Sequence, residues 1–130
     1  GTFQPDRPLG RLVQEMALRA LRDPRFFFNP IRPDELPRLQ VEISILSPMR
    51  RSRDPLAEFK VGVHGILIHC NGRGGCFLPQ VALETGWDAQ QMLANCCQHK
   101  AGLDADAWRS PDAEVYLFTA QVFSEAERVA

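Results

Sequence analysis

The chain has 130 residues, of which 45% are hydrophobic and 24% charged, and its formal net charge is −1. These values are typical of one soluble globular domain and argue against a protein built mainly to grip nucleic acid or an anionic membrane surface. No apolar run approaches the roughly 20 residues of a membrane-spanning helix. Four cysteines, two of them adjacent, do not form the pattern of a secreted disulfide framework, so we expect a reduced, cytoplasmic protein.

The first predicted element is an amphipathic helix over residues 8–22. Apolar residues recur there at the spacing of one helical face. Asp6 is placed to cap its first turn. The helix must end near Asp23, because the residue before Pro24 is pushed out of the α region. The aromatic run Phe26–Phe28 follows in a loop and is interpreted as part of a core or an interface.

A strand is predicted over Leu39–Ser47, where apolar and polar residues alternate. Glu42 and Ser44 share its polar face, so they would either contact a bound polar ligand or face water. The next segment, Met49–Pro55, is predicted to be a loop with three arginines. These arginines have two interpretations, a solvated surface connection or a contact to phosphate. They are Arg50, Arg51 and Arg53.

A β-hairpin is predicted at the centre of the chain. Its first strand, Val61–Cys70, is apolar on both faces, which indicates a position in the middle of a sheet. The segment Asn71–Gly75 is rich in residues that tolerate positive φ, and it is predicted to be the turn. Residues 76–78 would return antiparallel to the first strand.

Two helices and one strand are predicted after the hairpin. Pro79 can open a short helix that ends at Gly86. Asp88 is placed to cap a longer helix that ends at Gly102. The β-branched and aromatic run at residues 114–123 predicts a final strand.

This order of elements predicts an α+β fold. We expect a mixed, mostly antiparallel sheet whose central hairpin is covered by two amphipathic helices, those at residues 8–22 and 88–102. The fold is expected to form a single domain over residues 1–130. No internal repeat or low-complexity segment interrupts the sequence.

His64 is the first candidate for chemistry, because Gly65 beside it leaves room for a ligand to approach. As a general base it would need a carboxylate within hydrogen-bond reach, and Glu42 is the candidate partner. His64 and Glu42 are therefore the predicted catalytic residues, and Ser44 and Gln80 are predicted to bind in the same pocket. The alternative is a buried neutral histidine that is hydrogen-bonded to the backbone.

The cysteines and histidines lack the spacing of a zinc site. Zinc ligands usually include a pair two to four residues apart, whereas Cys70 and Cys76 are six apart. Cys97 and His99 are two residues apart, so on a helix their side chains point away from each other. No metal is therefore predicted, and the sequence identifies neither a cofactor nor an oligomeric state.

Seven segments occur in an order that carries a family resemblance. They are Gly1-Thr2-Phe3, Asp23-Pro24-Arg25-Phe26, Val41 through Pro48, Gly62-Val63-His64-Gly65, Phe77 through Ala82, Gly86-Trp87-Asp88, and Lys100-Ala101-Gly102-Leu103 with Trp108. Together they resemble the AMMECR-type domain family, named for the AMME chromosomal region, and within it the bacterial group called AmmeMemoRadiSam system protein A. Arg25, in the second segment, is taken as a further candidate binding residue.

The resemblance implies an α+β domain in two lobes, a cytoplasmic setting, and the company of a Memo-like protein and a radical-SAM protein. It also places the family motif Leu-Arg-Gly-Cys-Ile-Gly so that its last glycine falls on Gly1. The Arg and Cys of that motif, and the family's N-terminal segment, are then expected to precede this chain.

Two functions follow from these observations. The first is an enzyme, or a catalytic partner in the AmmeMemoRadiSam system, with a polar pocket around His64 and Glu42. In that hypothesis the upstream Cys would be the nucleophile and His64 its base. The second is a non-catalytic module that binds a Memo-like or radical-SAM partner through exposed aromatic residues such as those at residues 26–28. Nucleic-acid binding would rest on the arginine cluster alone, and no membrane contact is expected.

Overall fold

The computed structural model describes residues 2–3, 7–23 and 32–124, and its contacts divide the chain into two units. One unit consists of Gly1–Ser44 with Val122–Ala130, and the other of Ile45–Gln121. No helix in the described part of the chain is both long and apolar enough to cross a membrane.

The first unit contains the predicted N-terminal helix, α1 (Leu9–Leu21), and a short 3-10 helix, η2 (Pro33–Arg38). It also holds most of β1 (Glu42–Leu46) and part of β6 (Ala120–Ser124), which pair in a two-stranded sheet. No residue of α1, β1 or β6 is buried. The apolar stripe of α1 is only half-buried, at Leu12, Val13 and Met16.

The second unit is built on a four-stranded antiparallel sheet with the order β2-β5-β3-β4. Its strands are β2 (Arg50–Ser52), β3 (Gly65–Cys70), β4 (Arg73–Phe77) and β5 (Ala113–Phe118). The central position predicted for the hairpin's first strand is confirmed, since β3 lies between β5 and β4. Ile66 and Ile68 of β3 are fully buried. With helices on this sheet, the predicted α+β class is confirmed.

The hairpin turns on two residues, Asn71 and Gly72, whose φ angles are 52° and 78°. Positive φ at both central positions is the geometry that matches the twist of paired strands. The predicted turn of five residues is therefore too long, because Gly74 and Gly75 already lie in β4. Gly75 is needed for packing: a Cβ there would lie 2.7 Å from the backbone nitrogen of Ala101.

Helices α3 (Gln80–Thr85) and α4 (Ala89–Asn95) follow the hairpin as predicted. Asp88 caps α4 by accepting from Gln91 N at 2.8 Å, while the Gln91 side chain accepts from Asp88 N at 3.0 Å. The longer helix was expected to run without interruption to Gly102, but it changes to a π-helical turn, η3 (Cys96–Ala101). Gly102 ends it at φ 68°, as predicted.

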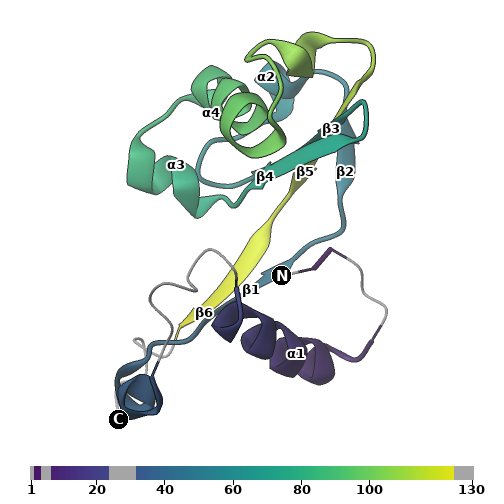
Figure 1. Cartoon of the computed structure of the whole chain (residues 1–130). Helices are drawn as coiled ribbons and strands as arrows, with labels where there is room; N and C mark the ends of the chain where they lie inside the picture. The colour runs from purple at the N-terminus through teal and green to yellow at the C-terminus, as the bar shows by residue number, and fades with distance from the viewer. Residues whose placement is uncertain (1, 4–6, 24–31, 125–130) are drawn as a thin grey trace. The chain divides into compact units, whose positions relative to one another are not determined.

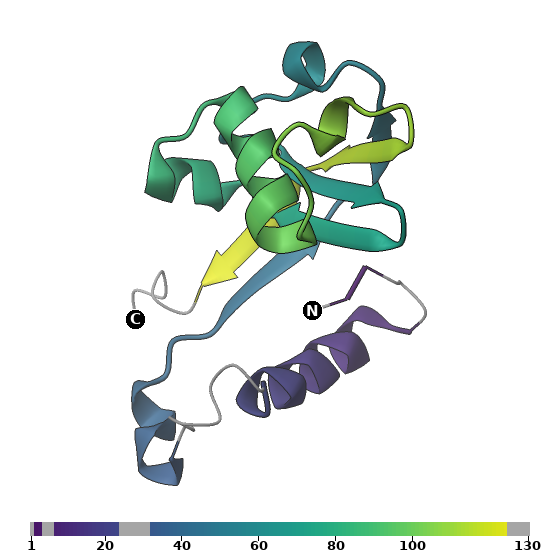
Figure 2. The same cartoon turned by 45° about the horizontal axis from the view of Figure 1, so that its top comes forward.

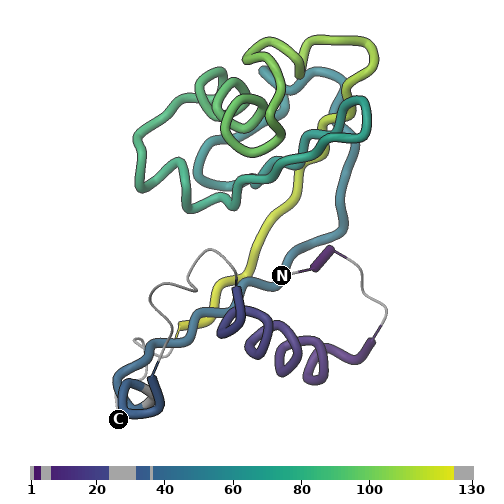
Figure 3. Tube along the Cα trace, in the orientation of Figure 1, coloured from purple at the N-terminus to yellow at the C-terminus, as the bar shows by residue number. Residues whose placement is uncertain are grey.

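Helix α4 and η3 lie over one face of the hairpin in Figures 1 and 2. The trace in Figure 3 shows the chain passing from α3 through α4 to η4 (Ala107–Arg109) before β5 returns to the sheet. Of the two helices expected to cover the hairpin, α4 does so, whereas α1 belongs to the other unit. The core consists of Phe59, Ile66, Ile68, Phe77, Ala82, Met92, Leu93, Cys96, Cys97, Trp108, Val115 and Leu117.

Two other predictions need correction. The segment Met49–Pro55, expected to be a loop, contains the edge strand β2 and leads into a helical turn, α2 (Pro55–Glu58). The final strand is not continuous, because Thr119 separates β5 from β6. At that position Thr119 N donates to the side chain of Ser47 at 2.8 Å, and the two flanking strands belong to different sheets.

Candidate functional site

His64 precedes β3 at the end of a tight turn that holds its ring in place. The carbonyl of Lys60 accepts from Val63 N at 3.1 Å and from His64 N at 2.9 Å. Lys60 N in turn donates to Nδ1 of His64 at 3.1 Å. Gly62 makes the turn possible with a φ of 84°, a value that other residues adopt only at a cost. The sequence therefore fixes the imidazole through its own neighbours.

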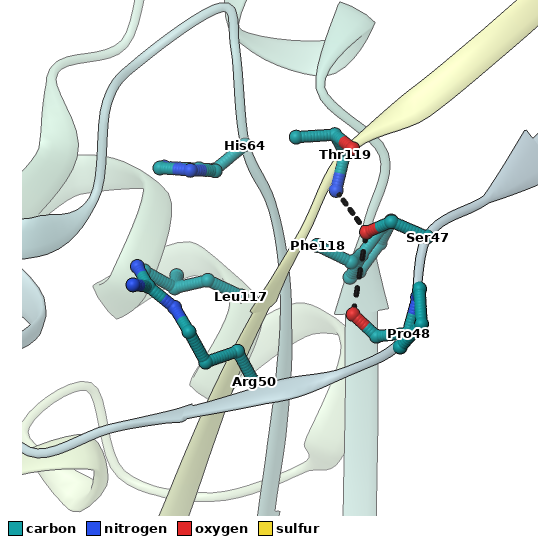
Figure 4. Close-up of a pocket in the computed structure, with 7 residues that line it drawn as sticks. All are labelled: Ser47, Pro48, Arg50, His64, Leu117, Phe118 and Thr119. Atoms are coloured by element: carbon teal, nitrogen blue, oxygen red, sulfur yellow. Dashed lines mark hydrogen bonds between the residues drawn. The ribbon is translucent and has the colours of Figure 1, made fainter.

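The imidazole lies at a shallow recess of about 280 Å³ in the second unit. Figure 4 shows the ring and the Arg50 guanidinium on one side of this recess, with Ser47 and Pro48 opposite. The recess is lined by Ser47, Pro48, Arg50, His64, Leu117, Phe118 and Thr119. Leu117 and Phe118 of β5 also line the recess, and both are almost completely buried.

The rim opposite His64 is fastened by hydrogen bonds between Ser47 and Thr119. Ser47 N donates to the Thr119 carbonyl at 2.9 Å, and Thr119 N donates to Ser47 Oγ at 2.8 Å. The Ser47 hydroxyl also donates to the Pro48 carbonyl at 3.2 Å. This hydroxyl is thus occupied within the rim, and the groups left to meet a ligand are the guanidinium and the imidazole.

His64 is a neutral hydrogen-bond donor in this setting. Partial burial lowers the pKa of its ring below the usual 6.5, and the positive charges of Arg50 and Lys60 lower the pKa further. Because Nδ1 accepts from Lys60, the neutral ring carries its proton on Nε2. An imidazole in this tautomer offers an N–H rather than a free lone pair, so the geometry favours hydrogen-bond donation over general-base catalysis.

The predicted site residues are only partly placed. Glu42 and Ser44 lie on β1 in the first unit, Glu42 exposed and Ser44 half-buried, so the structure does not test the expected pairing of Glu42 with His64. Gln80 opens α3 and is not among the described residues that line the recess. Arg25 lies outside the described residues.

Arg50 lines the recess beside His64, a position that the sequence interpretation did not predict. It was assigned to a loop, although its position opposite Leu117 on β5 brings it beside His64. None of the described lining residues is acidic, and within the described chain the Arg50 guanidinium has no carboxylate partner. Only the pairing of β2 with β5, which joins residues far apart in sequence, could have revealed this neighbour.

Residues 1–123 match the AMMECR1 family. This chain belongs to the AMMECR1 family. It is 40% identical over 134 residues to Protein MK0488 of Methanopyrus kandleri, covering 98% of this chain and 63% of that protein. It is 37% identical over 133 residues to Protein MJ0810 of Methanocaldococcus jannaschii, covering 98% and 65%.

The AMMECR1 fold is also present in a solved structure, the crystal structure of uncharacterized protein PH0010 from Pyrococcus horikoshii. The two structures superpose with a TM-score of 0.84 at 36% sequence identity, covering 94% of this chain and 61% of that one. The chain therefore spans about three-fifths of the length of the first relatives it matches.

In this AMMECR1 chain three of the four cysteines lie in the core, and Cys76 is half-buried. Cys70, Cys96 and Cys97 are buried, and all four are free thiols. Burial raises the pKa of Cys76 to about 11 and raises the pKa values of Cys96 and Cys97. Buried thiols of this kind are inert. Among the described residues no set of three His, Cys, Asp or Glu side chains is arranged to hold a metal ion.

Proposed function

We propose that this AMMECR1 domain binds a small carboxylate-bearing molecule in the recess around His64 and Arg50. We further propose that it acts in the cytoplasm as an enzyme or catalytic partner in the AmmeMemoRadiSam system. The observation that carries the first proposal is the convergence of an unpaired guanidinium and an imidazole N–H on a recess with no acidic lining residue among those described.

The size and charge of the recess favour a small, singly charged ligand. Its volume of about 280 Å³ lies just below the range of roughly 300–1,000 Å³ typical of small-molecule sites. A guanidinium binds a carboxylate through two parallel hydrogen bonds. In the proposed complex Arg50 forms this pair, while Nε2 of His64 donates to a further oxygen of the ligand.

This role differs from the base first expected of His64. A donor at Nε2 can polarise a ligand carbonyl or stabilise a developing negative charge, which is the electrostatic form of catalysis. Proton abstraction would require the ring to lose its bond to Lys60 N. We therefore propose that His64 acts as an electrophilic group. Glu42 and Ser44 on β1 remain candidates, Glu42 for catalysis and Ser44 for ligand binding.

The test is an NMR titration of the His64 ring with acetate, pyruvate and succinate. Binding should shift the His64 ring signals and raise the pKa of the ring, because a bound anion stabilises the imidazolium. Affinity should therefore increase as the pH falls through the ring's pKa. Arg50→Gln should abolish the shift, whereas Arg51→Gln, one residue along β2, should leave it intact. Unchanged His64 signals at millimolar ligand would refute the proposal.

A second candidate is the non-catalytic module that binds a Memo-like or radical-SAM partner. Its specific support is a group of exposed aliphatic side chains in the turn before His64 and on α3, namely Val61, Val63 and Leu83. Leu83 is 76% exposed, and its Cδ2 atom lies 3.5 Å from where a Cβ on Gly62 would be. The aromatic run that first suggested an interface, at residues 26–28, lies outside the described residues.

Co-elution with each partner separates the two candidates. Leu83→Asp should remove a complex that uses this aliphatic group and should leave carboxylate binding at His64 unchanged. Arg50→Gln should have the opposite effects. If no complex forms with either partner at micromolar concentration, the proposal of an interaction module is refuted.

A further inference from the structure

The second unit contains another, larger recess at the far end of β2. It has a volume of about 550 Å³ and is bounded by the segment from β2 into α2 and by the segment from η4 into β5. Three arginines line it, Arg51, Arg53 and Arg109, together with one carboxylate, Asp54. The chain as a whole carries a net charge of −1, so this concentration of positive charge is local to the recess.

Two of these arginines are unengaged by acids. Within the described chain, the side chains of Arg53 and Arg109 have no hydrogen-bond or ion-pair partner. The Arg51 guanidinium donates to the Ala113 carbonyl at 3.5 Å and lies 6.0 Å from the Tyr116 ring centroid. Its acidic partner among the described residues is Glu114, 3.9 Å away in a pair whose side chains are both about half exposed. Exposed pairs of this kind contribute at most about 1 kcal/mol, so Arg51 can turn to a ligand at little cost.

The walls that carry the arginines are fixed by buried contacts. Ser52 is 4% exposed, and its hydroxyl donates to Glu58 at 2.5 Å. On the other side, the Arg109 guanidinium lies 4.7 Å from the ring centroid of the buried Trp108. Stacking on an indole orients a guanidinium while leaving its N–H groups free. The recess is thus a preformed frame rather than a chance grouping of flexible side chains.

We infer that this recess binds a small molecule bearing a phosphomonoester or diphosphate group. One carboxylate has too few oxygens to accept bidentate hydrogen bonds from three guanidinium groups. A phosphate group has more oxygens and can accept from several arginine side chains at once. The volume is within the range of pockets that hold mononucleotide-sized ligands.

A nucleic-acid strand fits the recess less well than a small molecule. The face of Trp108 is covered by Arg109, so the indole offers no platform for successive bases to stack on. The chain's net charge of −1 also contrasts with the positive net charge typical of nucleic-acid-binding domains.

This site is independent of the recess at His64. Successive side chains of a strand point to opposite faces, so Arg50 and Arg51 diverge. Arg50 lines only the His64 recess and Arg51 only this one. Ligand binding at the two recesses can therefore be tested separately.

Calorimetric titration with inorganic phosphate, pyrophosphate, ADP and a short single-stranded RNA tests the inference. Pyrophosphate and ADP should bind, and Arg53→Gln and Arg109→Gln should each weaken binding by about tenfold or more, the expected loss of one charge-assisted hydrogen bond. Arg50→Gln is the matched control and should leave this affinity unchanged. Equal affinities for pyrophosphate and ADP would identify a general phosphate site, and tighter ADP binding would identify a nucleotide site.

Two results would overturn the inference. One is the absence of binding by every phosphate compound to a protein whose melting temperature shows that it is folded. The other is binding of RNA alone that Arg50→Gln weakens as much as Arg53→Gln, since this would indicate a diffuse electrostatic surface. Melting temperatures equal to that of the unaltered protein would exclude unfolding as the cause of weakened binding in the variants.

Discussion

Substituting Gly75 by alanine tests the packing on which the second unit depends. A Cβ at this position would lie 2.6 Å from Lys100 Cβ and 2.7 Å from Ala101 N. Both atoms belong to residues of η3 and neither moves when a side chain rotates, so no rotamer change relieves the contact. Overpacking of this kind costs about 1–3 kcal/mol, and the contact with backbone places Gly75→Ala at the upper end. Alanine also lowers the conformational entropy of the unfolded chain, which stabilises the folded protein by about 0.4–1 kcal/mol. The free energy of unfolding should therefore fall by about 2 kcal/mol in total.

Gly74→Ala is the matched control, because the same change is made one residue earlier on the opposite face of β4. Its Cβ would meet only Ile68 O at 3.5 Å and His69 Cδ2 at 3.6 Å, which are ordinary contacts. This variant should be as stable as the unaltered protein, or more stable by up to about 1 kcal/mol.

Urea unfolding followed by tryptophan emission measures both variants. The chain has two tryptophans, and both lie in the second unit, so the signal reports on the unit that contains Gly75. If Gly75→Ala and Gly74→Ala have free energies of unfolding within about 0.5 kcal/mol of each other, the usual range for neutral surface changes, then η3 does not pack on β4 as described.

Three further predictions concern the turn at His64 and the half-buried thiol of Cys76. The lowered pKa of His64 means that, below pH 6.5, the unfolded chain binds a proton that the folded chain does not. The stability that the neutral His64 ring contributes is therefore complete above pH 6.5, and it is lost as the pH falls toward the pKa of the folded protein. The free energy of unfolding in urea should therefore fall less on acidification in His64→Gln than in the unaltered protein. Gly62→Ala should cost about 1–2 kcal/mol, since its φ is left-handed, and should move the His64 pKa, measured by NMR, back toward 6.5. Cys76, whose pKa is raised to about 11, should resist iodoacetamide at neutral pH in the folded protein and react once it is denatured; rapid native labelling would contradict its burial.

The features that could be predicted from sequence are those fixed by neighbours along the chain. Asn71 and Gly72 form the hairpin turn because both tolerate positive φ. Asp88 and Gln91 cap each other's backbone over a single helical turn. The apolar character of both faces of β3 sufficed to place it at the centre of the sheet.

The features that escaped prediction depend on partners far away in sequence. Gly75 looked like a turn residue, but it is required by the backbone of η3 that passes over it. Strand β2 has three residues, two of them arginines, and becomes a strand only through pairing with β5. The same pairing brings Arg50 to His64, and this proximity could not be predicted from the sequence.

The register of β2 against β5 decides which recess each arginine lines. Ser52 pairs with Val115 and is buried, whereas Arg50 pairs with Leu117 at the open end of the strand. A slip of one residue would place Arg51 or Arg53 in the position of Ser52. Burying a guanidinium there would cost several kcal/mol in lost hydration, even beside the Glu58 carboxylate, and the hydrogen bonds of a three-residue edge strand contribute only about 1 kcal/mol each. One small buried serine therefore keeps Arg50 beside His64 and leaves Arg51 and Arg53 to the larger recess, so the two proposed sites depend on a single register.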